Sequence, residues 1–241
     1  HSMNIELIII FAITAVSGFV HSVLGFGYSL FAMSIMPFFL PVATSSAIVN
    51  CALLIMCLQI TFQLRKSINW KLAMPPTLFA LAGKTLGVMM LIYLPDDFLK
   101  RILGLFLVLL AIYLYSNKNL HVKPTFITGA IIGFFAGIIG GLFNLAGTIT
   151  AIYFFNCCDD KCEYSASMNL TFVPPAVMGL IMHYHYGLLT PTVMKSAIFN
   201  VIAIVMSTYA GIAVFKKINR QKLGKIIYLY VAVSGMFMMF S

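Results

Sequence analysis

The sequence has 241 residues, of which 61% are apolar and only 9% are charged. Its mean hydropathy of +1.01 excludes a water-soluble globular protein, because so few charged side chains cannot cover a globule. The 15 Lys and Arg residues outnumber the 6 Asp and Glu residues, but the bases lie in short loops between apolar runs, where they orient a membrane protein and do not indicate nucleic-acid binding. Backbone groups in hydrocarbon must bond internally, so these runs, which lack the alternation of barrel strands, predict an all-α integral membrane protein with several spans in the cell inner membrane.

Residues 5–40 form a first apolar segment that is too long for one upright helix, since about 20 apolar residues cross a bilayer. Gly25, Phe26 and Gly27 interrupt this segment near its middle, and we expect the helix to break there. The start of the segment has no cationic leader and no small-residue cleavage site, so we expect it to be retained as structure. Three runs of spanning length follow, over residues 43–64, 72–94 and 98–115.

The second half repeats this order of elements. Residues 126–155 form another long apolar segment, in which we expect the pair Gly140 and Gly141 to break the helix, and three more runs follow over residues 163–184, 192–215 and 223–240. Residues 18–25 align with residues 133–140, which supports an internal duplication. The sequence therefore predicts one membrane domain made of a first repeat, a linker and a second repeat, over residues 3–117, 118–124 and 125–241.

Loop charges predict the orientation of each repeat, because basic loops stay on the cytoplasmic side. In the first repeat, loop 65–71 is basic, turn 95–97 is acidic, and the linker after the repeat is basic again. In the second repeat, loop 216–222 is basic at the place that corresponds to the acidic turn. This reversal predicts two inverted-topology repeats, each a broken or re-entrant helical segment followed by three transmembrane helices, with both termini outside.

Interrupted helices in inverted repeats are a recurrent plan of transporters, because half-helices aim free N–H groups at an anion in the middle of the membrane. The alternative is that the glycines only let helices approach closely, as Gly83 and Gly87 would. Asn50 and Asn169 are matched amides that either face the same cavity or bond a neighbouring helix. The candidate substrate-binding residues at and around the two breaks are His21, Ser22, Gly25, Gly27, Tyr28, Gly140, Gly141, Asn144 and Thr148.

Lys84 lies near the middle of the run 72–94, where an ammonium group is costly unless it meets water, a partner or an anion. No acidic residue lies centrally in any predicted span, which favours an anionic substrate as its counter-ion. The alternative is that Lys84 reaches into a polar cavity that serves structure only. A coupled proton would have to be carried by His21, His183 or His185, and we expect the last two at the membrane interface because they end a span.

Two segments resemble a known family. Residues 17–27, followed by Pro37 and residues 43–46, resemble the first-half signature of the TauE/SafE sulfite exporter family, and residues 133–147 resemble its second-half counterpart. The resemblance implies secondary transport that exports sulfite, sulfoacetate or another organosulfonate. Tyr28 and Ser29 replace a glycine that the family often has, and Thr148 and Ile149 stand where it has prolines, so the substrate can differ while the fold is kept.

These observations predict a secondary transporter that moves a small sulfur-containing anion by alternating access, and not an enzyme. No cofactor is expected, and Cys157, Cys158 and Cys162 lack the paired spacing of a metal site. Two alternatives stay open: a passive anion channel, and a membrane-embedded thiol-redox enzyme that uses these cysteines with Cys51 and Cys57. The expected partners are the anion and the lipid bilayer, with no nucleic acid; coupling to a proton or another ion and assembly into a homo-oligomer are left open.

Overall fold

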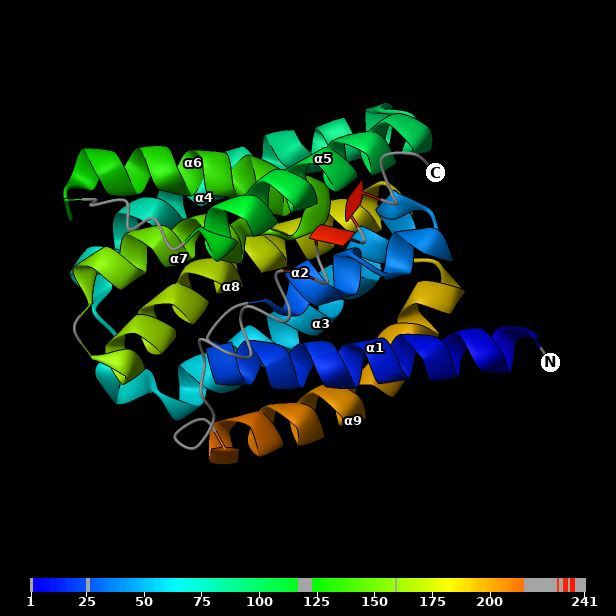
Figure 1. The fold of residues 1–241 in the computed structure, drawn as a ribbon, viewed down its shortest axis with the longest axis horizontal. Helices are drawn as coiled ribbons and strands as arrows, with labels where there is room; N and C mark the ends of the chain where they lie inside the picture. Colours follow the sequence, from blue (N-terminus) through cyan, green and yellow to red (C-terminus); the bar gives the residue numbers. More distant parts are fainter. Residues whose placement is uncertain are drawn as a thin grey trace. The chain divides into compact units, whose positions relative to one another are not determined.

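The computed structural model describes residues 2–24, 27–116, 123–158 and 160–214, together with residues 229, 232–233 and 235–236. Within these residues all regular secondary structure is helical (Figure 1). The helices fall into two compact units. The first unit contains α1, α2, η1, the start of α3, α5 and α9, and the second contains the rest of α3 with η2, α4, α6, α7 and α8. Each unit thus takes helices from both of the predicted repeats.

The first predicted break is confirmed. Helix α1, Ser2–Leu24, ends before the glycines, and α2, Tyr28–Met33, begins after them, with the 3-10 turn η1 at Met36–Phe38. Gly27 has a φ of 111°, a left-handed conformation that glycine adopts without a steric penalty. Gly25, which the sequence predicts as part of the anion site, lies outside the described residues.

The second predicted break is wrong by several residues. Helix α6, Phe126–Phe143, runs without interruption through Gly140 and Gly141 and ends at Asn144, and α7, Ala146–Cys157, follows. Asn144 has a φ of 57°, and its short amide side chain tolerates this left-handed conformation better than most side chains do. Gly141 instead permits close packing, because a Cβ there would lie 2.6 Å from the Cα of Gly87.

The long helices follow the predicted runs closely. Their observed bounds are Val42–Gln63 for α3, Trp70–Tyr93 for α4, Asp96–Tyr115 for α5, Lys161–His185 for α8 and Pro191–Val214 for α9. The predicted run 223–240 lies almost entirely outside the described residues.

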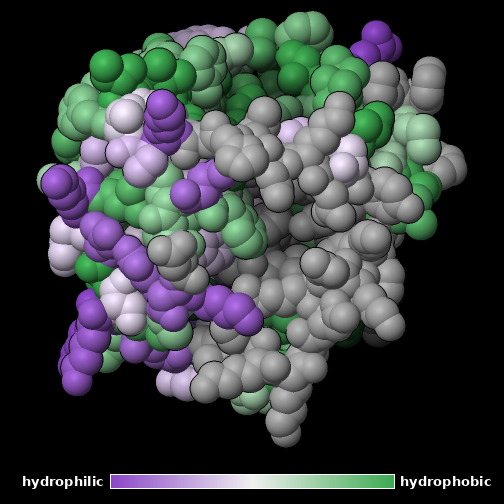
Figure 2. All heavy atoms as spheres, turned by 60° about the vertical axis from the view of Figure 1, so that its left-hand side comes forward, coloured by the Kyte–Doolittle hydropathy of each residue, from purple (hydrophilic) through white to green (hydrophobic). Residues whose placement is uncertain are grey.

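Five of the described helices are long and apolar enough to cross a membrane: Val42–Gln63, Trp70–Tyr93, Phe126–Phe143, Lys161–His185 and Val193–Gly211. Large apolar side chains such as Leu86 on α4 and Phe135 on α6 are exposed, as lipid contact requires. Figure 2 shows this hydrophobic surface beside separate patches of hydrophilic residues.

Glycines bring α4 and α6 into backbone contact in the second unit. A Cβ on Gly83 would collide with the backbone of Phe134, and one on Gly87 would collide with that of Ile138. In the first unit α1 packs along α9 (Figure 1), where Gly18 faces Ser207 and Phe11 stacks edge-on against Phe199 at 6.1 Å. In both units, therefore, the first helix of one repeat's broken segment pairs with a spanning helix of the other repeat.

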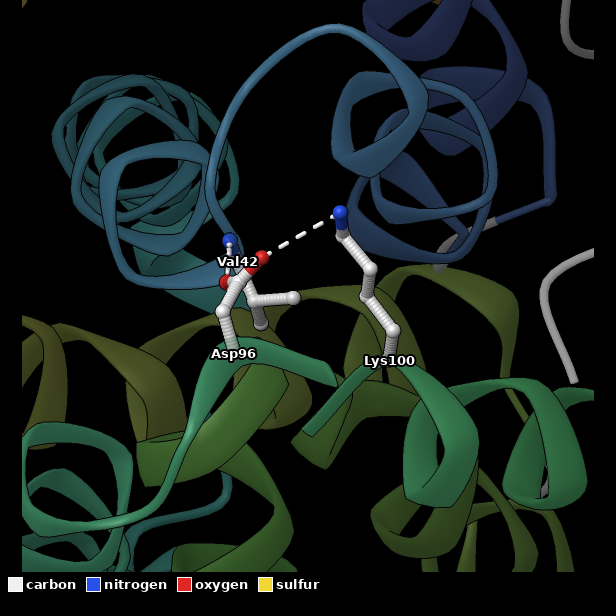
Figure 3. A network of polar contacts seen from close by, with 3 residues as sticks. All are labelled: Val42, Asp96 and Lys100. Carbon is white, nitrogen blue, oxygen red and sulfur yellow. Dashed lines mark hydrogen bonds and ion pairs between the residues drawn. The ribbon is translucent and has the colours of Figure 1, made fainter. Parts of the chain in front are cut away.

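Asp96 connects two helices of the first unit at their N-terminal ends. Its Oδ1 accepts a 2.6 Å hydrogen bond from the backbone N–H of Val42, the first residue of α3, and its Oδ2 lies 3.2 Å from the Lys100 Nζ (Figure 3). A carboxylate at this position satisfies one of the free N–H groups of α3 and complements the positive end of its dipole.

Asn69 has a similar role in the second unit. Its Oδ1 accepts a hydrogen bond from the Leu72 N–H at the start of α4, its Nδ2 donates to the Glu163 Oε1 at 2.7 Å, and its N–H donates to the Ser167 Oγ at 2.9 Å. The short turn η2, Arg65–Ser67, precedes it. One residue of loop 65–71 therefore joins the N-terminal ends of α4 and α8.

Candidate functional site

The second unit contains a cavity of about 20 Å³ at the join between α6 and α7. That volume accommodates about one water molecule. It is lined by side chains of α4, α6, α7 and α8, and by Leu53 of α3; the polar ones are Lys84, Asn144, Thr150 and Thr171. The wall is otherwise apolar, so Lys84 supplies the only formal charge in this lining.

Lys84 is 3% exposed and its ammonium group contacts the end of α6. The Nζ donates to the Gly140 carbonyl oxygen at 2.8 Å and to the Asn144 Oδ1 at 2.8 Å. The last carbonyls of a helix have few intrahelical donors and carry its partial negative charge, so this end attracts a cation. From the sequence we expected an anionic substrate as the counter-ion of Lys84. The end of α6 was not predicted as its partner, because the position of that end depends on the conformation of Asn144.

The first turn of α7 lies on the other side of the same join. Ala146 begins α7 and lines the cavity together with Asn144 and Thr150. The N–H groups of a first helical turn carry a partial positive charge. The negative end of α6 and the positive end of α7 therefore meet at Asn144 and Leu145, beside the charged group of Lys84.

Comparisons with known proteins identify the family of the chain. Residues 10–238 match the sulfite exporter TauE/SafE family. The chain belongs to this family. A TauE/SafE chain of this kind is a multi-pass membrane protein of a transporter family. A relative from Methanocaldococcus jannaschii, named a probable membrane transporter protein, is 24% identical over 193 residues, which are 72% of this chain and 70% of the relative. No solved structure matches the chain.

Six predicted site residues of this TauE/SafE protein lie in the second unit. Lys84, Gly140 and Asn144 line the cavity. Gly141 is buried against the backbone of α4, and the Thr148 Oγ1 donates to the Leu145 carbonyl oxygen at 2.7 Å. Asn169 is also buried and donates to the Ser165 carbonyl oxygen at 2.9 Å. Three of these six predicted residues therefore line the same cavity.

The other described site residues lie in the interior of the first unit. The backbone N–H of Tyr28 points to the Nδ1 of His21 at 3.4 Å, so this ring nitrogen acts as an acceptor at the start of α2. Ser22, Gly27, Tyr28 and Asn50 are buried as well. The structure thus buries these residues around the first break of this TauE/SafE chain, and their role in anion binding stays a prediction.

Some buried polar groups of the first unit were not among the predicted site residues. The Oγ of Ser45, the Nδ2 of Asn200 and the Oγ1 of Thr208 are buried and have no hydrogen-bond partner within the described part of the chain. Their spacing on α9, at positions 200 and 208, is a helical repeat that places both on one face. The sequence itself shows these two polar residues within an apolar span, and their helical spacing could have indicated a polar face on α9.

His183 and His185, which the sequence predicts at the membrane interface, separate in the structure. His185 is exposed, but His183 is fully buried, and neither of its ring nitrogens has a hydrogen-bond partner among the described residues. The neighbouring helices thus cover His183 and leave His185 uncovered, and the interfacial placement of both stays a prediction. The two positions lie on different faces of α8, and the hydropathy of a run does not reveal which face the neighbouring helices cover.

Proposed function

We propose that this protein exports a small sulfur-containing anion, such as sulfite or an organosulfonate, by secondary transport, and that the cavity around Lys84 forms part of its anion site. The observation that carries the proposal is the position of the Lys84 Nζ, buried at the join of α6 and α7. The Gly140 carbonyl oxygen and the Asn144 Oδ1 each accept a hydrogen bond from the ammonium group at 2.8 Å. The oxygens of a sulfite or sulfonate group can replace them as acceptors.

The chemistry of the lining suits an anion that must be released again. Charge-assisted hydrogen bonds are about twice as strong as neutral ones, so a single lysine provides attraction without a second fixed cation. The Thr150 and Thr171 hydroxyls donate to carbonyl oxygens of their own helices at 2.9 Å, and the first turn of α7 adds neutral N–H donors. A weakly charged site of this kind binds an oxyanion and permits its departure.

Alternating access is the mode of transport that this geometry favours. A cavity of about 20 Å³ has no room for sulfite, so the anion enters only when the join of α6 and α7 moves. The interruption at Asn144 and Leu145 supplies a place where the two helices can move relative to one another. Helix interruptions lining a site in the middle of the membrane serve this purpose in other transporters.

We further propose that the two repeats have inverted topology. The reversal of loop charge between the repeats supports this arrangement. The recurrence of one kind of helix pair, α1 with α9 and α6 with α4, supports a duplicated plan. The proposed inversion orients the two broken segments oppositely in the membrane.

Uptake of radiolabelled sulfite and sulfoacetate into proteoliposomes tests the proposed function. We expect Lys84→Ala to reduce uptake by a factor of about 30 or more, since removing one member of a buried hydrogen-bonded charge pair costs about 2–5 kcal/mol. Lys71→Ala, at an exposed lysine of the same helix, is the matched control and should transport normally. Equal transport by both variants, at equal amounts of reconstituted protein, would show that Lys84 is not part of the site.

Counter-transport separates the proposed mechanism from a channel. With alternating access, unlabelled anion trapped inside the vesicles accelerates the entry of labelled anion, because each returning site carries a substrate. A channel shows no such acceleration. Its absence, with transport otherwise intact, would exclude alternating access.

A further inference from the structure

Another hollow of the second unit lies between loop 65–71 and the start of α8. It is an open groove of about 460 Å³. Sites for small molecules commonly have volumes of about 300–1,000 Å³, so the groove has room for a ligand. It shares no lining residue with the cavity around Lys84. Its polar and aromatic lining residues are Lys66, Ser67, Asn69, Trp70, Asp160 and Glu163.

The groove contains opposite charges that do not pair with one another. Lys66 belongs to the turn η2, whereas Asp160 and Glu163 lie at the start of α8. Within the described residues, neither carboxylate forms an ion pair with the Lys66 ammonium group, although all three side chains line the same groove. The groove therefore offers one positive and two negative groups to a ligand that lies between them.

The two carboxylates are held in place, and each keeps one oxygen for another donor. The Asp160 Oδ2 accepts hydrogen bonds from the N–H groups of Cys162 and Glu163 at 2.8 and 3.0 Å. The Glu163 Oε1 accepts one from the Asn69 Nδ2 at 2.7 Å. The other oxygens, Oδ1 of Asp160 and Oε2 of Glu163, are thus available to a donor in the groove.

Aromatic side chains indicate that the groove lies at the surface of the membrane. Trp70 lines it, is 59% exposed and begins α4, one of the helices long and apolar enough to span a bilayer. Phe62, near the end of α3, is 69% exposed, and the Arg65 guanidinium lies 4.7 Å from its ring centre. Tryptophan side chains and the charged ends of basic residues collect at the level of the lipid headgroups. A lipid headgroup is therefore the ligand nearest to hand.

We propose that this groove binds the headgroup of phosphatidylethanolamine. The lipid phosphate accepts a charge-assisted hydrogen bond from the Lys66 Nζ, and the primary ammonium group donates to the available oxygens of Asp160 and Glu163. The acyl chains extend into the bilayer beside Trp70. The lipid thereby joins loop 65–71 to the start of α8. This site does not depend on the proposed anion site.

Other phospholipid headgroups match the groove less well. A headgroup with only negative charge, such as phosphatidylglycerol, meets two carboxylates, although the exposed Lys71 and Lys161 nearby attract it to the surface. Phosphatidylcholine carries the same charges as phosphatidylethanolamine, but its trimethylammonium group has no N–H to donate. The groove should therefore prefer phosphatidylethanolamine to both.

The fluorescence of Trp70 tests the proposal, because the sequence contains one tryptophan. The full chain is reconstituted in phosphatidylcholine that is brominated near the headgroup end of its acyl chains, since bromine quenches a tryptophan in contact with the lipid. Unbrominated lipids are then added in place of the brominated one. We expect phosphatidylethanolamine to restore the fluorescence at about one third of the mole fraction that phosphatidylcholine requires, the gain typical of one exposed ion pair. Equal restoration by both, or stronger restoration by phosphatidylglycerol, would overturn the proposal.

Variants that remove charge but keep the hydrogen bonds within the protein test the ammonium site. Asp160→Asn keeps an oxygen that caps α8, and Glu163→Gln keeps an acceptor for Asn69. The double variant should respond equally to phosphatidylethanolamine and phosphatidylcholine. Asp97→Asn, at an exposed carboxylate of the first unit, is the matched control and should behave as the wild type. A preference that persists in the folded double variant contradicts the assignment, and Glu163→Gln alone repeats the measurement if thermal unfolding shows that the double variant is misfolded.

Glycerophosphoethanolamine distinguishes the lipid from a water-soluble ligand of the same chemistry. It has the same headgroup without acyl chains, so it should leave Trp70 quenched by the brominated lipid. Recovery of the fluorescence on its addition would assign the groove to a soluble ligand and overturn the lipid assignment. None of these measurements involves transport, so their outcomes are independent of the proposed function.

Discussion

Asn144 combines a backbone role and a side-chain role at one position. Its φ of 57° ends α6, and it is the one non-glycine residue with a positive φ in the described part of the chain. Its Oδ1 accepts a hydrogen bond from the Lys84 Nζ at 2.8 Å. Asparagine suits both roles, because it tolerates the left-handed conformation and offers a neutral oxygen to the ammonium group.

Substitutions of Asn144 should separate these roles. Asn144→Ala introduces backbone strain and removes an acceptor, so we expect a loss of about 2–4 kcal/mol of stability, whereas Asn144→Gly removes the acceptor without strain and should lose less. Asn144→Asp keeps the acceptor and adds a negative charge, which should preserve the fold and weaken anion binding. Thermal unfolding in detergent and sulfite binding provide the measurements. An Ala variant as stable as the wild type, or an Asp variant that binds anion normally, would contradict this account.

At the scale of elements, the contact of α4 with α6 depends on glycines. Gly83 and Gly87 on α4 face Gly137 and Gly141 on α6, and a Cβ at any of them would lie within about 3 Å of the facing backbone. The alternative in which glycines allow close helix packing is therefore correct for Gly141. This packing positions Lys84, which lies between Gly83 and Gly87 along α4, against the end of α6.

Adding a methyl group at this contact should force the helices apart. We expect Gly87→Ala and Gly141→Ala each to destabilise the protein by about 1–3 kcal/mol, and to reduce transport, because the Lys84 Nζ would no longer reach the end of α6. Gly187→Asn is the matched control: a Cβ there meets nothing within 4 Å, and asparagine tolerates its positive φ. Thermal unfolding and proteoliposome uptake measure the two effects. A Gly87→Ala variant that melts with the wild type would show that the contact is looser than described.

At the scale of the whole molecule, the two predicted repeats exchange helices between the compact units. The first unit includes α9 from the second repeat, and the second unit includes α4 from the first. Neither repeat is therefore expected to fold alone, because each lacks the helix that covers its broken segment. The orientation of the repeats in the membrane stays a prediction from loop charge.

Cysteine labelling tests that orientation. Helices α3 and α8 occupy matched places in the two repeats, so inverted repeats put their C-terminal ends on opposite sides of the membrane. In a cysteine-free background we expect K66C, just after α3, to react with an impermeant maleimide only from the cytoplasmic side, and H185C, at the end of α8, to react from outside. Both positions are exposed. Labelling of both from the same side would indicate parallel repeats.

The sequence by itself determined the helical membrane class and the spans. The predicted bounds of α3, α4, α5, α8 and α9 agree with the structure to within two residues, because a spanning helix is encoded by local hydropathy and by the breakers that flank it. The first break was also predictable, since it coincides with a glycine-rich segment in which Gly27 has a φ of 111°. Family membership likewise followed from motifs that are local in sequence.

Only the tertiary structure decided where the second break falls, what holds the ammonium group of Lys84 and which histidine is buried. In the sequence alone, Gly140 and Gly141 predict a helix break. In the structure Gly141 packs against α4 instead, and the helix continues to Phe143 before the interruption at Asn144. Lys84 is held by a carbonyl and an amide from another helix, and His183 is buried by neighbours distant in the chain. Conformation and burial at these positions depend on non-local contacts, which the pattern of a single run does not encode.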